Sequence, residues 1–396
     1  MKTIRFAVAV TLVVAALLAL RPDPAQAIPV FARKYGLQCS NCHSAAPRLN
    51  DWGQRFRANG YRLPGRENEE KTILEGPPPF AARTSFGYTY ERFANGAVGT
   101  DRSSFRVNGL DILSAGVIAP HVSFLVVYPP PLTDSRGVEG QAGTIEMASV
   151  VFSGLGSPWV NLRAGRLEPA CTAFSAKRHL GIAPYEVYEY AFPGGSPFSE
   201  PQEGVELTGS GRGFAYAAGL VNGSATNLPD DGPADVYARA SMVLGVGEGQ
   251  TAGQRIGVVG YLGKARPEAG PGELQTFNRV GVDASLNFKQ VNLAGQWLYS
   301  TDDQALWGSP DDVNWSGYFA ELSWQPLVEG VAFARYDRVN SPAWLEQDVM
   351  RLTGGGRYYL ADNLALHFEY SRRTLETPLS EDPTEDLATT RIDFAF

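Results

Sequence analysis

Apolar and polar residues alternate along most of this chain from about residue 80 onward. Between residues 363 and 371, large apolar side chains recur at every second position, with polar ones such as His367 and Glu369 between them. A period of two indicates β-strands whose two faces meet different surroundings. In a transmembrane barrel the apolar face contacts lipid and the polar face lines the lumen, so the pattern favours a barrel over a soluble β-sandwich or propeller.

The alternation predicts sixteen antiparallel strands, which make residues 80–396 an outer-membrane, porin-like β-barrel. An even strand number places both ends of the barrel on the periplasmic side, and about sixteen strands enclose a lumen. Short connections alternate with long ones, as expected for periplasmic turns and external loops. The strands are expected near residues 80–92, 104–117, 121–129, 144–152, 158–167, 203–210, 214–222, 234–244, 254–263, 276–287, 291–300, 315–324, 330–339, 348–359, 362–373 and 387–396.

The longest connection, residues 168–203, carries Cys171 and His179. Long segments without regular structure usually have a function. Two alternatives fit the sequence equally well: the segment folds into the lumen as a constriction, or it covers the outer opening. In either case we expect His179 to lie further from the N-terminal part of the chain than the strand histidines do.

Residues 1–27 have the pattern of a signal peptide. A basic start is followed by an apolar stretch from Phe6 to Leu20 and by the small-residue site Ala25-Gln26-Ala27. The apolar stretch is short for a membrane anchor helix, so we expect it to be cleaved. Residues 28–79 then form a separate unit. It contains a predicted helix after Leu49 and is too small to bury a stable core without leaning on the barrel.

The chemistry in this unit is concentrated in Cys39-Ser40-Asn41-Cys42-His43. Cys-x-x-Cys-His is the attachment motif of a c-type haem, in which both cysteines bind the porphyrin covalently and the histidine binds the iron. A zinc site would need further Cys or His ligands, and residues 28–79 contain none. The third cysteine, Cys171, has no partner and is expected to be a buried small side chain rather than a reactive thiol.

The motif does not indicate which group binds the sixth coordination position of the iron. Methionine or histidine usually fills it in electron carriers, but residues 28–79 hold no methionine and no second histidine. His367 and His121, predicted to face the lumen near the periplasmic mouth, are therefore candidate distal ligands. The alternatives are an open site, a weaker donor within the N-terminal unit, or lumen histidines with no metal role.

Composition narrows the class of protein further. The chain has a formal net charge of −8 and no basic cluster, which argues against nucleic-acid binding. It contains 43 glycines, 20 phenylalanines and 17 tyrosines, and after the signal segment no apolar run is long enough for a transmembrane helix. Many aromatic residues and glycines without such a run are typical of an outer-membrane barrel.

The stretches Pro29 to His43 and Pro47 to Tyr61 resemble the start of the fused outer-membrane monohaem cytochrome–porins of iron-oxidising bacteria. This resemblance implies one N-terminal haem c followed by a sixteen-stranded barrel in the bacterial outer membrane. By position, Cys39 and Cys42 would attach the haem and His43 would be the proximal ligand. It also implies electron transfer from extracellular Fe(II) to a periplasmic c-type cytochrome, an iron:cytochrome c oxidoreductase activity.

Two other functions remain open at this point. The chain could be a solute-conducting porin whose haem segment acts as a plug or sensor, or a soluble periplasmic cytochrome with a β-domain. Bilayer conductance would favour the first, and recovery without detergent would favour the second. No arrangement of nucleophile and base suggests an enzyme acting on an organic substrate.

Overall fold

The computed structural model describes residues 30–396 with several gaps. The gaps are residues 46, 64–71, 76–78, 97, 134–138, 142, 158, 191–197, 199, 212, 224–234, 245–252, 266–274, 304–311, 343–344, 346 and 378–381. The expected signal peptide, residues 1–27, lies outside the described part of the chain.

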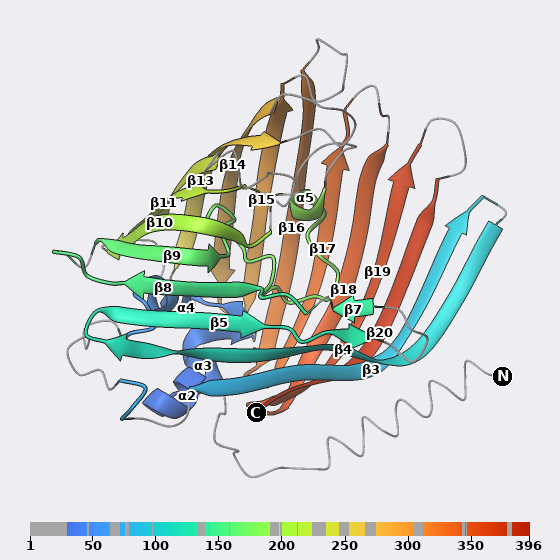
Figure 1. Ribbon diagram of the computed structural model, residues 1–396. Coiled ribbons are helices and arrows are strands. Elements are labelled where there is room, and N and C mark those ends of the chain that lie inside the picture. The colour runs from blue at the N-terminus through green and yellow to red at the C-terminus, as the bar shows by residue number, and fades with distance from the viewer. Residues whose placement is uncertain are drawn as a thin grey trace.

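Sixteen antiparallel strands form one closed barrel (Figure 1). The last strand pairs with the first, β20 with β3, and β9 pairs with β10, so no strand edge is left open. The strands are β3 (Phe80–Asn95), β4 (Val98–Ala119), β5 (Val122–Tyr128), β8 (Met147–Phe152), β9 (Asn161–Leu167), β10 (Gln202–Gly211), β11 (Phe214–Val221), β12 (Asp235–Leu244), β13 (Gln254–Ala265), β14 (Gln275–Phe288), β15 (Val291–Asp302), β16 (Val313–Leu327), β17 (Gly330–Asn340), β18 (Asp348–Ala361), β19 (Leu364–Glu376) and β20 (Thr384–Ala395).

The barrel is apolar outside and polar inside. On β10, Val205 and Leu207 are 42% and 37% exposed, whereas Glu206 between them is 1% exposed. A protein in water would not leave alternate apolar residues on its surface and bury the charged ones, but a closed barrel in lipid does. The described residues contain no helix that is long and apolar enough to cross a membrane. The chain is therefore an outer-membrane β-barrel.

The strand prediction is confirmed in number and in order. Its main error lies between the first two strands, where a long external loop was expected. Instead β3 and β4 continue as far as Asn95 and Val98, which face each other across a tight turn. A separate two-stranded sheet, β6 (Leu132–Thr133) with β7 (Glu139–Gln141), lies between β5 and β8 in the sequence.

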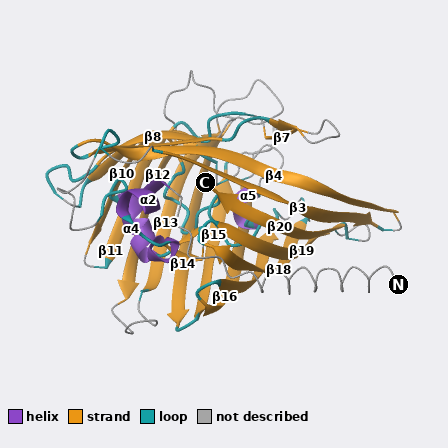
Figure 2. Ribbon diagram, turned by 90° about the horizontal axis from the view of Figure 1, so that it is seen from below, coloured by secondary structure: helices purple, strands orange, loops and turns teal. Residues whose placement is uncertain are grey.

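The N-terminal segment lies inside the barrel. It consists of helices α2 (Val30–Tyr35), α3 (Cys39–Cys42) and α4 (Asp51–Ala58) with the short strands β1 (His43–Ala45) and β2 (Arg48–Leu49). Seen along the barrel, α2 and α4 lie within the ring of strands (Figure 2). We refer to residues 30–63 as the plug.

The plug shares its hydrophobic core with the barrel wall. Phe56 and Tyr61 of the plug are in one buried cluster with Leu125, Val127 and Met147 of β5 and β8. The aromatic rings of the plug also pack on one another, with Phe31 stacked on Tyr61 at 4.7 Å between ring centroids. The expectation that this small unit leans on a larger one is confirmed, because its core is completed by residues of the wall.

The long connection between β9 and β10 also enters the barrel. Its described part folds into the lumen and does not cover the outer opening. Tyr185 and Tyr188 are 2% and 0% exposed and pack against Phe319 of β16. The segment includes the short helix α5 (Glu186–Glu189), which lies next to β16 and β17 (Figure 1). We refer to residues 168–201 as the lumen loop. The described residues of the plug and of the lumen loop therefore both pack against the inner side of the wall.

Candidate cofactor site inside the barrel

The Cys39–His43 motif is held against the start of helix α4. Asn50 caps this helix, because its side-chain oxygen accepts a hydrogen bond from the Gly53 N–H at 2.8 Å. The other end of the same amide donates to the Asn41 carbonyl at 3.1 Å, and the Asn50 N–H donates to the Cys42 carbonyl at 2.9 Å. One asparagine therefore joins the helix to the motif and fixes where both cysteines lie.

The ring of His43 is oriented by a backbone carbonyl. Its Nδ1 lies 3.0 Å from the Pro47 oxygen. A carbonyl oxygen only accepts hydrogen bonds, so in the neutral ring Nδ1 carries the proton and Nε2 is the nitrogen with the lone pair. A hydrogen bond of this kind at the second nitrogen is the usual way in which a metal-binding histidine is aimed. Burial lowers the pKa of His43, and the charge of Arg178 acts in the same direction.

The two motif cysteines are half-buried free thiols at the ends of α3. The Cys39 thiol lies 3.4 Å from the backbone oxygen of Asp362, in the turn between β18 and β19. Burial, together with the nearby Asp362 charge, raises the pKa of Cys39 to about 11. Two protonated thiols and one aimed imidazole fit the attachment of a c-type haem. Among the described residues, no cluster of three or more His, Cys, Asp or Glu forms a metal site.

Two ion pairs anchor the plug on separate sides. Arg48 binds Glu321 of β16 at 2.7 Å, where the carboxylate is fully buried, and also donates to Asn292 of β15 at 3.0 Å. Arg57 of α4 binds Glu168 of the lumen loop at 2.9 Å. Buried pairs of this kind make removal of either partner costly, so the plug is fixed in one position.

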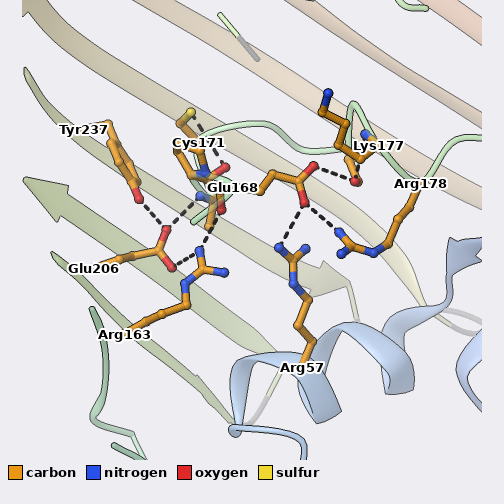
Figure 3. A network of polar contacts seen from close by, with 11 residues as sticks. Arg57, Arg163, Glu168, Cys171, Lys177, Arg178, Glu206 and Tyr237 are labelled. Atoms are coloured by element: carbon orange, nitrogen blue, oxygen red, sulfur yellow. Dashed lines mark hydrogen bonds and ion pairs between the residues drawn. The ribbon is translucent and has the colours of Figure 1, made fainter. Parts of the chain in front are cut away.

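Glu168 is the centre of a polar network between the plug and the lumen loop (Figure 3). Besides Arg57, its carboxylate accepts hydrogen bonds from Arg178 at 2.7 Å and from the Ser175 hydroxyl at 2.5 Å. Burial alone would raise the pKa of Glu168, but these partners hold the pKa at about 2. Nearby, Glu206 binds Arg163 at 2.6 Å and accepts from the Tyr237 hydroxyl. The lumen loop is therefore locked to the plug by charge.

A cavity of about 810 Å³ remains between α4, the lumen loop and β9 to β15. Seven arginines and three acids line it, but each arginine is ion-paired with one of these acids, with Asp283 or with Glu321, so seven positive charges meet five negative ones. The arginines are Arg48, Arg55, Arg57, Arg163, Arg178, Arg239 and Arg255, and the acids are Asp51, Glu168 and Glu206.

The two predicted distal ligands occupy different surroundings. His367 faces inward as expected but is 0% exposed, with Nε2 3.2 Å from Glu369 and Nδ1 3.8 Å from Asp393. His121 lies in the β4–β5 turn rather than at the start of the strand, with a φ of 64°. Its side chain is exposed, and Nδ1 lies 3.0 Å from the Ser153 carbonyl.

Sequence reasoning missed the residues that hold this site together. Asn50 had a readable signal, because asparagine directly before a helical pattern is a common N-cap. No sequence signal indicated Glu168 or Arg178, since the pairing of Glu168 with Arg57 and with Arg178 depends on the path of the lumen loop. That His179 lies further from the plug than the strand histidines stays a prediction: its neighbour Arg178 reaches Glu168 and, through it, α4, whereas His121 itself lies 3.3 Å from Arg62 of the plug. Cys171 is fully buried as expected, and burial raises its pKa.

The fold defines the chain as a barrel of the porin type. It is similar to an anion-selective porin from Comamonas acidovorans, with a TM-score of 0.58 and 13% identity over 80% of this chain and 99% of the porin. The outer membrane channel DcaP of Acinetobacter baumannii gives a TM-score of 0.57 and 11% identity, covering 80% of this chain and 97% of the channel. Salmonella typhi OmpF, in a complex with daunomycin, gives a TM-score of 0.53 at 12% identity, over 80% and 97%.

These similarities establish the architecture and nothing finer, because all three identities are low. No protein-family model matches the chain, and no curated protein sequence does.

Proposed function

We propose that this outer-membrane barrel carries one c-type haem on its plug and transfers electrons across the outer membrane. The observation that carries the proposal is the His43 ring, whose Nδ1–H is held by the Pro47 carbonyl next to two free thiols. A haem supplies reversible one-electron chemistry at its iron, and the protein supplies position and surroundings. Cys39 and Cys42 would hold the group by thioether bonds, and His43 Nε2 would be the proximal ligand.

The barrel supports this role by fixing where the motif lies. Cys39 contacts the β18–β19 turn, at the end of the barrel where the short turns are found. In outer-membrane barrels that end faces the periplasm. A periplasmic c-type cytochrome is therefore the proposed acceptor, since it can approach this opening closely. Arg48 and Arg57 hold the plug against opposite parts of the interior, so the distance to a docked partner stays constant.

The proposed donor is extracellular Fe(II), which follows from the resemblance of the plug sequence to the cytochrome–porins of iron oxidisers. Ferric iron forms insoluble oxides, so keeping the oxidation outside the cell protects its interior. The reaction would be an iron:cytochrome c oxidoreductase activity. Purified protein, made together with haem-maturation machinery, should be reduced when mixed rapidly with Fe²⁺. A haem that stays oxidised in excess ferrous iron at several pH values would rule out this donor.

A second function is favoured by the arginine-lined cavity, which suits a channel for small anions. The similar Comamonas acidovorans protein is described as an anion-selective porin. A solute channel should give large, anion-selective conductance in planar bilayers with the plug in place. An electron-transfer protein should conduct poorly until residues 28–79 are deleted. Measuring both forms of the protein therefore separates the two functions.

A further inference from the structure

We infer that residues 72–75, in the connection between the plug and β3, are anchored in the periplasmic leaflet of the outer membrane, where Ile73 and Leu74 contact phospholipid. The grounds are the position of Ile73 on the outer face of β4, the exposure of Leu74, and the apolar residues at the same rim of the barrel. The inference goes beyond the proposed function, because it needs no haem.

The chain passes from the inside of the barrel to its rim between Tyr61 and Ile73. Tyr61 is 8% exposed and belongs to the buried cluster that the plug shares with the barrel wall. The Ile73 N–H, in contrast, donates to the Val117 carbonyl near the periplasmic end of β4 at 2.9 Å. Strand β3 begins only at Phe80, which faces Ser114. The segment therefore binds the edge of β4 beyond the start of β3.

The side chain of Ile73 lies on the outer face of β4. A Cβ on Gly116 would come within 2.5 Å of Ile73 Cγ2. Gly116 stands between Ala115 and Val117, which are 2% and 1% exposed, and Ala115 belongs to the buried cluster of the plug. Successive side chains of a strand point to opposite faces, so position 116 faces outward, toward lipid. Because Gly116 has no side chain, Ile73 fits against the wall there.

The same segment presents Leu74 at the tip of a closed turn. The Glu75 carboxylate accepts hydrogen bonds from the Thr72 N–H at 2.9 Å and from its hydroxyl at 3.0 Å. The Glu75 N–H donates to the Thr72 carbonyl at 3.1 Å, which closes the turn. Leu74 is 90% exposed, more than any other large apolar side chain in the described part of the chain. The turn therefore holds a leucine away from the protein, beside a wall that faces lipid.

The neighbouring residues place this turn at the boundary of the membrane. Phe80 at the start of β3 and Ile118 near the end of β4 are 59% and 48% exposed. Phe396 is 58% exposed and lies next to them, since its N–H donates to the Ala82 carbonyl at 2.8 Å. Aromatic and apolar residues form such girdles where a barrel wall meets the membrane surface. The surface of Ile73 and Leu74 continues this girdle, so its partner is the lipid that the girdle already contacts.

The plug is thus held by two kinds of contact. Inside the barrel, Arg48 and Arg57 bind it through ion pairs. Outside, the turn at residues 72–75 fixes the connection to the rim through apolar contacts, which do not depend on the charges in the lumen. The connection therefore stays at the rim when an ion pair of the plug is broken.

The test is photo-cross-linking of the full-length protein in outer membranes whose phospholipid carries tritiated glycerol. The photoreactive residue p-benzoylphenylalanine is placed at residue 74 in one sample. The controls carry it at residue 288, where Phe288 is 56% exposed at the periplasmic end of β14, or at residue 55, where Arg55 is exposed on the plug inside the barrel. Illumination should join labelled phospholipid to the protein at residues 74 and 288 and not at residue 55.

A second variant tests whether Ile73 places the turn. With the probe at residue 74, Ile73→Asp should reduce the cross-linked phospholipid several-fold, while the barrel keeps its heat-modifiable migration. Label at residue 288 without label at residue 74 would overturn the inference, and so would equal label at residues 74 and 55. An unchanged yield in I73D would overturn the anchoring by Ile73. A haem-free barrel that still cross-links at residue 74 would contradict the proposed function and leave this inference standing.

Discussion

Gly53 lies directly against the carbonyl oxygen of Cys42, so closely that a Cβ on residue 53 would come within 2.1 Å of that oxygen. Glycine inside a helix normally costs stability, roughly 1 kcal/mol relative to alanine. Helix α4 accepts this cost because only a residue without a side chain lets the motif approach the helix. Asn50 binds both residues, because its side chain accepts from the Gly53 N–H and its own N–H donates to the Cys42 carbonyl. The approach of Gly53 to Cys42 therefore sets the position of the Cys39–His43 motif.

We predict that Gly53→Ala lowers haem content sharply while the barrel still folds. The added methyl group would displace Cys42 and, with it, His43. The measurement is haem per protein, together with heat-modifiable migration in gels as a check of the barrel. Gly260→Ala is the control, because a Cβ at residue 260 meets no atom within 4 Å. Normal haem content in G53A would mean that the packing of α4 does not position the motif.

We predict that Glu168→Gln loosens the plug from the lumen loop. Removing the charge leaves Arg57 and Arg178 buried without their partner, and breaking a buried pair in this way costs about 3–5 kcal/mol. The variant should unfold at a lower denaturant concentration and show more frequent channel openings in planar bilayers.

The control for this variant is Glu203→Gln. Glu203 also pairs with an arginine, Arg166, but the two side chains are 54% and 34% exposed. Exposed pairs contribute about 0–1 kcal/mol, so E203Q should behave like the wild type. Equal effects of the two substitutions would show that the Glu168 network does not hold the plug.

The attachment of the plug to the lumen loop should weaken at low pH only. The pKa of Glu168 is lowered in the folded protein, to about 2. The stability that this carboxylate contributes is therefore complete above its unfolded pKa, near 4.5, and is lost as the pH falls from there toward 2. Bilayer conductance should stay low from pH 7 to about pH 5 and rise only below that range. The rise should be absent in E168Q, which lacks the titrating group.

The sequence predicted the barrel well because a membrane barrel imposes a simple rule on every strand. Each strand must place apolar residues toward the lipid and polar residues toward the lumen. This rule can be applied to one strand without knowing its neighbours. It fails where a strand leaves the membrane. The ends of β3 and β4 are exposed on both faces and mix polar residues with exposed Phe93 and Val98, so the rule predicts a loop where the structure has a hairpin.

The interior was harder to predict because its contacts join distant parts of the chain. Arg57 and Glu168 are 111 positions apart, and neither residue type indicates the other. Alternation placed His367 correctly on the inner face, but it cannot show that this side chain is fully buried beside Glu369 and Asp393. The path of a loop depends on the sum of many weak contacts, whereas the Cys-x-x-Cys-His motif can be read directly because covalent attachment requires those residues at that spacing.

The most direct test of the account is the haem content of the purified, heat-modifiable barrel after denaturation. Wild-type protein should give a pyridine haemochrome spectrum with about one haem per chain, which stays with the polypeptide in a denaturing gel because thioether bonds survive unfolding. The double variant Cys39→Ser with Cys42→Ser should form the same barrel without covalent haem. A correctly folded wild-type barrel, made with haem-maturation machinery and yet free of haem, would contradict the central claim.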